Sequence, residues 1–151
     1  MTKKEFAKMI DHTLLRPNIN SSDIEKLCNE AKEYGFYSVC VNPYYIPFVK
    51  ELLSGVDIKI CTVIGFPLGA NSTKVKVYEV KEALSLGANE FDMVINIGAL
   101  KDKRKNYLLN EIREVVMAAE GNIVKVIIET CYLTDEEKMW ATEIIKEGGA
   151  H

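Results

Sequence analysis

The segment Glu-Phe-Asp-Met-Val-Ile-Asn at residues 90–96 alternates polar and apolar side chains along one short run. Side chains of a β-strand point alternately to its two faces, so Asp92, Val94 and Asn96 share one face, opposite the apolar residues 91, 93 and 95. A parallel strand that is buried on both faces is expected to be apolar throughout. The segment therefore predicts a strand with its apolar face under helices and its polar face lining an interior.

Runs of this kind, short and rich in Val and Ile, occur five times along the chain and alternate with helix-like stretches. The strand-like runs span residues 9–15, 38–42, 58–66, 90–97 and 124–130. The helix-like stretches span residues 21–34, 43–53, 72–86, 106–119 and 134–146. Gly35 ends the first helix, and Thr134 with Glu137 forms a capping box at the start of the last. Without a linker rich in Gly, Pro or Ser, this pattern predicts one α/β domain, residues 1–151, built on a parallel sheet.

The spacing of the units favours a TIM (β/α)8 barrel. Strand starts lie about 28 residues apart, so eight units would take about 225 residues, close to the usual size of such a barrel. The chain would then hold about five of the eight β/α units, as the N-terminal part of the barrel. A flavodoxin-like open sheet has the same number of strands, but helices cover both of its faces, which should then be apolar. Strand order distinguishes the two folds, because sequential neighbours indicate a barrel arc and a switch point indicates the open sheet.

Composition excludes several classes of protein. The chain has 151 residues, of which 48% are hydrophobic, and a net charge of −3, unlike a disordered chain. No basic stripe indicates a nucleic-acid partner, and the one basic cluster, residues 101–105, is expected to be a solvated loop or helix start. No apolar run has the length of a membrane helix, and no apolar segment follows the charged N-terminus as in a signal peptide. We therefore expect a cytoplasmic protein with neither a membrane nor a nucleic acid as its partner.

Cysteines and histidines indicate neither disulfides nor a metal centre. Three of the four cysteines lie in or beside apolar runs and none forms a CxxC pair, so reduced, buried thiols are expected for Cys28, Cys40, Cys61 and Cys131. The two histidines, His12 and His151, have no cluster of ligands around them in the sequence. By strand parity His12 faces the helices, which favours a core residue over a catalytic one.

Charged side chains recur on the interior face that the strands share. Strand parity places there Asp11, Thr13, Cys40, Asp92, Lys125 and Glu129. A buried charge is costly unless it is paired, so the acids and the lysine depend on one another. A structural ion-pair network would satisfy them. Acids and a lysine on neighbouring strands also shift each other's pKa values, which suits proton transfer or amine chemistry.

A turn with two glycines, Gly65-Phe-Pro-Leu-Gly69, follows the third strand-like run. Its backbone could approach a ligand, and turn geometry alone explains the glycines about as well. A lone Gly-x-x-x-Gly is a weak indication of function.

Five motifs occur in order along the chain: Ile-Asp-His-Thr-Leu-Leu (10–15), Val-Cys-Val-Asn-Pro (39–43), Val-Ile-Gly-Phe-Pro-Leu-Gly (63–69), Glu-Phe-Asp-Met-Val-Ile-Asn (90–96) and Lys-Val-Ile-Ile-Glu-Thr (125–130). Together they closely resemble the 2-deoxyribose-5-phosphate aldolase family, which are class I aldolases on a TIM barrel. The resemblance implies reversible cleavage of 2-deoxy-D-ribose 5-phosphate to D-glyceraldehyde 3-phosphate and acetaldehyde. It also implies a lysine Schiff base, no metal or other cofactor, and small phosphorylated sugars and aldehydes as partners.

The resemblance assigns roles to five residues. Asp92 resembles the family's acid/base aspartate, and Lys125 resembles an interior lysine of the catalytic site that is not the Schiff-base residue. The positions of Asp11, Thr13 and Cys40 match positions that line the substrate pocket. These roles are expectations from the motifs.

Residues 1–151 lack three features that the resemblance implies: the Schiff-base lysine, the proton-relay lysine of the seventh strand, and the Gly- and Ser-rich loops of strands six to eight that hold the phosphate. The family's Schiff-base lysine lies in a Lys-Thr-Ser-Thr-Gly motif on the sixth strand, and residues 1–151 contain no such motif. We therefore expect that lysine beyond residue 151 and no Schiff-base turnover by this chain alone, either as a fragment of a longer enzyme or as a stable product that has lost catalysis. The alternative is a non-catalytic α/β half-barrel module that acts by assembly or complementation. Open edges at the first and fifth strands would favour self-association, so a homo-oligomer is expected.

Overall fold

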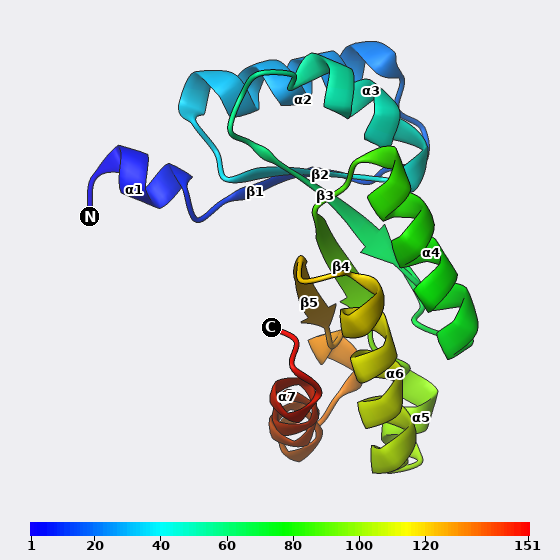
Figure 1. The fold of residues 1–151 in the computed structure, drawn as a ribbon. Coiled ribbons are helices and arrows are strands. Elements are labelled where there is room, and N and C mark those ends of the chain that lie inside the picture. Colours follow the sequence, from blue (N-terminus) through cyan, green and yellow to red (C-terminus); the bar gives the residue numbers. More distant parts are fainter.

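The computed structural model describes residues 1–151 and contains a five-stranded parallel sheet flanked by helices (Figure 1). The strands are β1 (Asp11–Leu14), β2 (Ser38–Val41), β3 (Lys59–Ile64), β4 (Glu90–Val94) and β5 (Ile123–Ile127). The helices are α1 (Lys3–Ala7), α2 (Ser21–Tyr34), α3 (Ile46–Leu52), α4 (Thr73–Leu86), α5 (Ile97–Lys101), α6 (Lys105–Ala118) and α7 (Asp135–Gly148), with 3-10 turns at Pro43–Tyr45 and Thr130–Tyr132. The predicted β/α alternation is confirmed, and the short helices α1 and α5 are additions to it.

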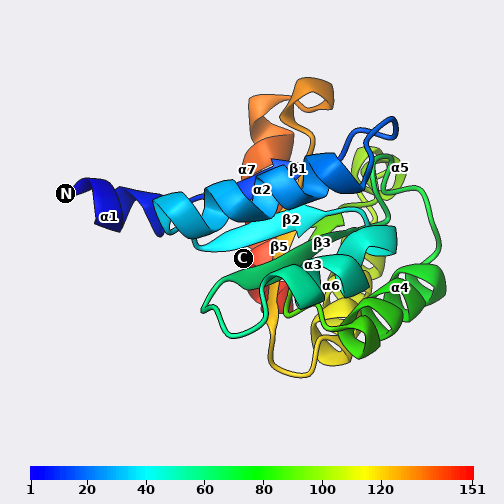
Figure 2. The ribbon, with the colours of Figure 1, turned by 90° about the horizontal axis from the view of Figure 1, so that it is seen from above.

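The strands lie side by side in sequence order, β1-β2-β3-β4-β5, and each neighbouring pair is parallel. A flavodoxin-like sheet would contain a switch point in this order, so that alternative is wrong. Helices α2, α3, α4 and α6 follow one another around the outside of a strongly curved sheet (Figure 1). From above, α2 and α3 lie over the first three strands (Figure 2). The arrangement is an arc of a barrel with its helices on the convex side.

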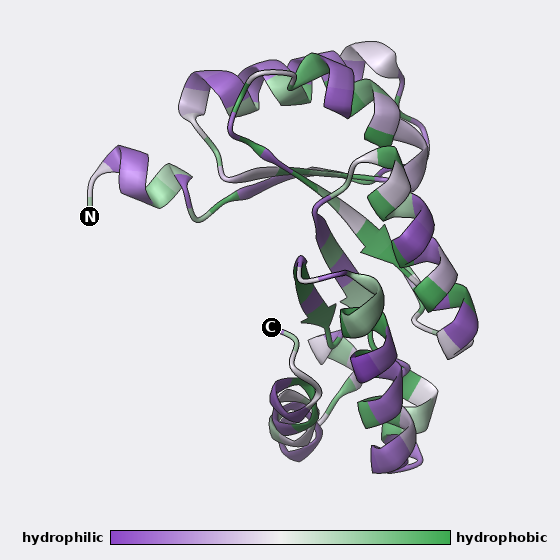
Figure 3. Ribbon diagram, in the orientation of Figure 1, coloured by the Kyte–Doolittle hydropathy of each residue, from purple (hydrophilic) through white to green (hydrophobic).

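The two faces of the strands differ as predicted. On the convex face, Val41, Phe91 and Met93 are completely buried in a core of 31 residues shared with the helices. Hydrophobic and hydrophilic segments alternate along the helices, as expected for elements with one buried side (Figure 3). Removal of this apolar surface from water holds the helices against the sheet. The opposite, concave face carries the polar side chains and a small buried cluster of Cys40, Cys61 and Val63.

Helix ends follow the predicted signals. The Asn20 side chain accepts hydrogen bonds from the first turn of α2, and Gly35 ends that helix with a φ of 69°. Thr134 and Glu137 form the predicted capping box of α7. None of the helices combines the length and the apolar character that crossing a membrane requires.

All five strands end earlier than predicted, and β4 and β5 each end three residues early. In β4 the strand stops at Val94, because the Asn96 side chain accepts a hydrogen bond from Ala99 N and caps α5. In β5 the strand stops at Ile127, and Glu129 has a left-handed φ of 51°. The chain turns at that point, so strand parity does not apply to Glu129.

The free edge of β5 is partly covered by the chain itself. Val126 N donates to His151 O at 2.7 Å, and His151 N donates to Val124 O at 2.9 Å. The backbone at His151 thus lies beside β5 on the edge away from β4. No strand pairs with the outer edge of β1, the edge away from β2.

Candidate active site

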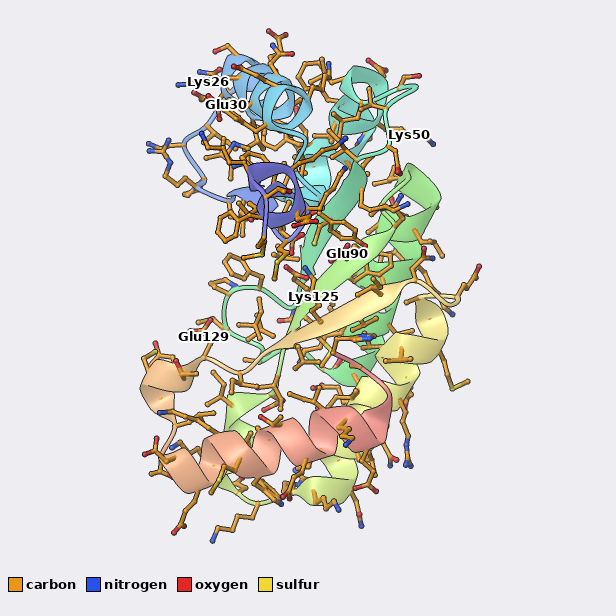
Figure 4. The ribbon with its side chains drawn as sticks, turned by 90° about the vertical axis from the view of Figure 1, so that its left-hand side faces the viewer. Lys26, Glu30, Lys50, Glu90, Lys125 and Glu129 are labelled. Carbon is orange, nitrogen blue, oxygen red and sulfur yellow. The ribbon has the colours of Figure 1, made fainter.

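Three carboxylates surround the ammonium group of Lys125 on the concave face. Lys125 Nζ lies 2.5 Å from Asp11 Oδ2, 2.7 Å from Glu90 Oε1 and 3.0 Å from Asp92 Oδ1. Glu90 and Lys125 lie close together on neighbouring strands (Figure 4). The structure therefore brings together the predicted interior charges of Asp11, Asp92 and Lys125, and it adds Glu90 to them.

Strand register places these groups. Asp92 is directly opposite Lys125 in the β4–β5 pairing, and Glu90 is two residues earlier on the same face of β4. Asp11 approaches from β1, across the curve of the sheet. Its register partner Ser38 donates a hydrogen bond from Oγ to Asp11 Oδ1 at 2.6 Å. Both carboxylate oxygens of Asp11 are thus held by the chain.

Lys125 is a fixed cation. Burial disfavours its charged form, but hydrogen bonds to Asp11 and Glu90 outweigh burial and hold the pKa of Lys125 well above its ordinary value. A protonated amine has no lone pair with which to attack a carbonyl. Lys125 therefore serves this site as a positive charge and a hydrogen-bond donor, and it is not a nucleophile at neutral pH.

Glu90 is the most deeply buried of the three acids, with 2% of its surface exposed. Burial raises the pKa of Glu90, and the hydrogen bond from Lys125 opposes that rise only in part. Its Oε2 atom has no hydrogen-bond partner. Three carboxylates face one lysine here, so the concave face carries an excess of acidic groups.

Asp92 keeps one carboxylate oxygen free of contacts within the chain. Its single ion pair uses Oδ1, and 18% of its side chain remains exposed. In Asp11 both oxygens are engaged, and only 3% of the Glu90 side chain is exposed. The Oδ2 atom of Asp92 is therefore a carboxylate oxygen of this cluster that the chain leaves unpaired and that a molecule on the concave face can reach.

The other predicted pocket residues lie on adjacent strands. Thr13 and Cys40 are register partners in β1 and β2. Thr13 is exposed, and its hydroxyl donates to the backbone oxygen of Asp11 at 2.8 Å. Cys40 is buried, and its partner in the next strand is Cys61. Of these two register partners, Thr13 is therefore accessible to solvent and Cys40 is not.

The four thiols are free, but they lie in different surroundings. Cys28, Cys40 and Cys61 are buried, as expected, whereas Cys131 is exposed. Burial raises the pKa of Cys28 to about 11. The neighbouring Cys40 thiol and burial together raise the pKa of Cys61. The thiols of Cys28 and Cys61 are therefore protonated at neutral pH.

Two further predicted residues are placed by the structure. The prediction that Glu129 belongs to the interior charges is wrong, because β5 ends before it and it makes no ion pair with Lys125 (Figure 4). His12 faces the helices as predicted, with Nε2 2.8 Å from Glu30 Oε2 and its ring centroid 4.8 Å from that of Phe36. Neither residue is part of the cluster around Lys125.

Turn geometry accounts for the loop at residues 65–69. Gly65 and Gly69 have φ values of 62° and 65°, and a Cβ at Gly69 would lie 2.0 Å from Ile95 O. Gly65 N donates to Glu79 Oε2, and Gly69 N donates to Gly65 O, each at 2.7 Å. Both amides are used within the chain, so neither is directed at a ligand.

Sequence reasoning missed two residues of the concave face, Glu90 and Cys61. Glu90 has the same strand parity as Asp92, so counting back two residues along the alternating segment would have found it. Cys61 lies in a run that reads as apolar on both faces, and its pairing with Cys40 depends on a register that one strand alone does not reveal.

Comparison with known sequences identifies the family. A family model described as the DeoC/LacD family aldolase matches residues 6–146. The chain is 74% identical over 151 residues to the deoxyribose-phosphate aldolase of Dictyoglomus turgidum, covering 100% of this chain and 69% of that protein. It is 58% identical over 154 residues to the deoxyribose-phosphate aldolase of Carboxydothermus hydrogenoformans, covering 99% of this chain and 68% of that protein. The chain thus spans about two thirds of the length of these curated relatives.

Solved structures of similar proteins contain the same arc of strands and helices. A crystal structure of a Coccidioides immitis protein superposes with a TM-score of 0.96 at 41% identity, covering 99% of this chain and 59% of that one. The deoxyribose phosphate aldolase of Aeropyrum pernix, described as a tetramer, superposes with a TM-score of 0.90 at 31% identity, covering 99% and 63%. The five β/α units are therefore an incomplete TIM barrel, and the chain belongs to the DeoC/LacD family of aldolases.

Proposed function

We propose that the protein contributes to the reversible aldol cleavage of 2-deoxy-D-ribose 5-phosphate to D-glyceraldehyde 3-phosphate and acetaldehyde. Residues 1–151 supply one wall of the site, with Asp92 as the acid/base, Lys125 as a fixed cation, and Asp11, Thr13 and Cys40 lining the substrate pocket. The single observation that carries this proposal is the position of Lys125 between three carboxylates on the concave face of an aldolase-family sheet.

The nucleophilic lysine is proposed to come from outside residues 1–151. Lys125 is held in its charged form by Asp11 and Glu90. Burial lowers the pKa of Lys76, against the opposing effect of Glu111, so its amine is the more easily deprotonated. Its side chain, however, is completely buried, and Nζ donates to Glu111 and to Val94 O. A substrate on the concave face cannot reach it, so neither lysine suits a Schiff base.

Asp92 has a defined task in this reaction. Once the substrate aldehyde is bound to a lysine as an iminium ion, a base removes the proton of the C3 hydroxyl group. The electrons of the C2–C3 bond then flow to the iminium, which releases glyceraldehyde 3-phosphate and leaves an enamine. Protonation of the enamine at C2 and hydrolysis release acetaldehyde and regenerate the amine. The free Oδ2 of Asp92 can take up the hydroxyl proton and return it at C2, directly or through water.

Lys125 keeps the acids in place for that task. A cation between Asp11, Glu90 and Asp92 reduces the repulsion among three carboxylates and fixes the direction of Asp92. Three buried thiols are free, which supports a location in a reducing compartment such as the cytoplasm. The tetrameric Aeropyrum pernix relative supports a homo-oligomeric assembly for this protein as well.

Reductive trapping tests the proposal. The 151-residue chain is incubated with acetaldehyde and sodium borohydride, and its intact mass is measured. The same is done with a chimera in which the C-terminal third of the Dictyoglomus turgidum aldolase is joined after His151. We expect an unmodified mass near 17.0 kDa for the short chain and one reduced adduct on the chimera. An adduct on the short chain at Lys125 would contradict the assignment of the nucleophile.

A non-catalytic half-barrel module remains the second candidate, because β1 presents an outer edge that no strand covers. Such an edge is a template for pairing with another chain. If the chimera neither forms an adduct nor cleaves the substrate, while the short chain assembles into a defined complex, this second function is the better account.

A further inference from the structure

Two thiols and a carboxylate converge on the concave face next to the cluster around Lys125. They are Cys40 in β2, Cys61 in β3 and Asp92 in β4, which lie on three consecutive strands. Their potential ligand atoms, two sulfurs and one oxygen, all lie within 4.8 Å of one another. Apart from Asp92, none of these side chains takes part in the ion pairs of Lys125.

The sheet itself creates this arrangement. Cys40 and Cys61 are register partners, and hydrogen-bonded strands lie about 4.8 Å apart. Asp92 pairs with Val63, two residues after Cys61 on the same face of β3. Two thiolates on one tetrahedral zinc ion lie about 3.8 Å apart, given Zn–S bonds of about 2.3 Å. Small side-chain rotations are therefore sufficient to bring the donor atoms onto one ion, with the backbone in place.

The chemistry of the donors selects a soft, divalent cation. Thiolate ligands prefer zinc and related thiophilic metals, whereas magnesium and calcium prefer oxygen ligands. Asp92 Oδ1 is buried and lacks a hydrogen-bond partner, although it lies 3.0 Å from Lys125 Nζ. The surrounding face holds three carboxylates and one ammonium group, so its charge favours a cation over an anion.

We propose that Cys40, Cys61 and Asp92 form a binding site for one thiophilic divalent cation, Zn²⁺ or its analogue Cd²⁺, with a fourth position open to water. The exposed part of the Asp92 side chain provides the route of entry, because both cysteines are buried. Binding releases the two thiol protons to solvent, so that two thiolates and one carboxylate hold the ion.

The site shares Asp92 with the proposed aldolase chemistry and acts against it. Asp92 cannot hold a metal ion and also accept a proton from a substrate. A bound cation would also repel the Lys125 ammonium group, which would keep its contacts to Asp11 and Glu90. The metal is therefore an inhibitor of the proposed reaction, and its binding to the chain does not depend on that reaction.

Titration of the reduced 151-residue chain with Cd²⁺ tests the site, followed by the ultraviolet charge-transfer absorption of cadmium–thiolate bonds and by native mass spectrometry. We expect one Cd²⁺ ion per chain and a charge-transfer absorption band that disappears when Zn²⁺ displaces the Cd²⁺. Cys40→Ser and Cys61→Ser should each abolish the ion's tight binding, and Asp92→Asn should weaken it by at least the roughly 10-fold that outer-shell changes cause. Cys28→Ser and Cys131→Ser are the matched controls, one buried and one exposed, and should bind as the original chain does.

A second measurement covers the case in which a buried serine prevents folding. In the unsubstituted chain, Cd²⁺ should protect Cys40 and Cys61 from alkylation by iodoacetamide during partial unfolding, and leave Cys28 and Cys131 reactive. A band that persists in Cys61→Ser, a band lost in Cys131→Ser, or equal alkylation of all four thiols with and without Cd²⁺ would each overturn the proposal.

Discussion

Asp11 and Lys125 are 114 residues apart in the sequence, yet Asp11 Oδ2 lies 2.5 Å from Lys125 Nζ. The two residues come from the first and last strands of the sheet, so this contact spans the concave face of the arc. It can form only when the sheet curves, because in a flat sheet three strands would separate β1 from β5 by about 19 Å. The presence of this ion pair therefore indicates that the sheet is curved as in a barrel.

Removal of the central cation should destabilise the chain. Lys125→Met leaves Asp11, Glu90 and Asp92 facing one another without a counter-charge. We expect a loss of about 3 kcal/mol in the free energy of unfolding, the low end for a broken buried ion pair, because 28% of the Lys125 side chain is exposed. Urea denaturation measures this loss. The control Lys101→Met removes a surface pair with Glu137 and should cost much less, because exposed ion pairs contribute little to stability; equal losses would contradict the role given to Lys125.

Glu90 should give the stability of the chain a specific pH dependence. Burial raises the pKa of Glu90, so the folded chain holds this proton more tightly than the unfolded chain does. The free energy of unfolding therefore falls as the pH rises from about 4.3, the ordinary pKa of a glutamate, through the raised pKa of Glu90 in the folded chain. The fall is about 1.4 kcal/mol for each unit by which the two pKa values differ.

Glu90→Gln has no proton to lose, so its unfolding free energy should lack this component across the same pH range. Urea unfolding at a series of pH values compares the original chain, Glu90→Gln, and the exposed control Glu114→Gln. A pH profile of Glu90→Gln that parallels that of the control would show that Glu90 is ionised in the folded chain at little cost.

The buried pair between α4 and α6 should behave as a structural pair. The side chains of Lys76 and Glu111 are both 0% exposed, and Lys76 Nζ lies 2.9 Å from Glu111 Oε2. Lys76→Met leaves the buried Glu111 carboxylate without a counter-charge and should lower the free energy of unfolding by about 3–5 kcal/mol. The double variant Lys76→Met with Glu111→Leu should recover most of that loss. A double-mutant cycle in urea measures the coupling. Independent, additive losses would mean that the two charges do not depend on each other.

Gly69 should tolerate no side chain. A Cβ there would lie 2.0 Å from the backbone oxygen of Ile95, so Gly69→Ala must displace the end of β4. Gly35 has a similar φ of 69° with nothing within 4 Å of its Cβ position, so Gly35→Ala carries only the backbone strain, about 1–2 kcal/mol. Thermal unfolding of both variants isolates the effect of the clash. Equal destabilisation would show that the loop at residues 65–69 can move away from β4.

Strand parity was sufficient to predict much of this site. The alternation in residues 90–96 and in residues 124–128 predicts that Asp92 and Lys125 lie on one face, and the register of β4 and β5 confirms it. Parity failed at Glu129, because a left-handed residue after β5 ends the strand and nothing in the local sequence indicates that conformation.

Register and curvature are the properties that the sequence did not reveal. The pairing of Cys40 with Cys61 depends on how two strands align, and the contact between Asp11 and Lys125 depends on how the whole sheet bends. Helices α1 and α5 were missed because each has five residues, too few for a periodic apolar pattern. Their ends are fixed by caps, by Thr2 and by Asn96 respectively.

The rate of substrate cleavage by the chimera with the Dictyoglomus turgidum aldolase tests the central claim most directly. The release of glyceraldehyde 3-phosphate from 2-deoxyribose 5-phosphate is compared between Asp92→Asn and Asp102→Asn, a control in an exposed turn. We predict that Asp92→Asn lowers kcat by about 100-fold or more, the usual contribution of a general acid/base, while borohydride still traps its adduct with acetaldehyde. The control should retain full activity. Cleavage by Asp92→Asn at the rate of the control would contradict the account, because the acid/base would then be another group.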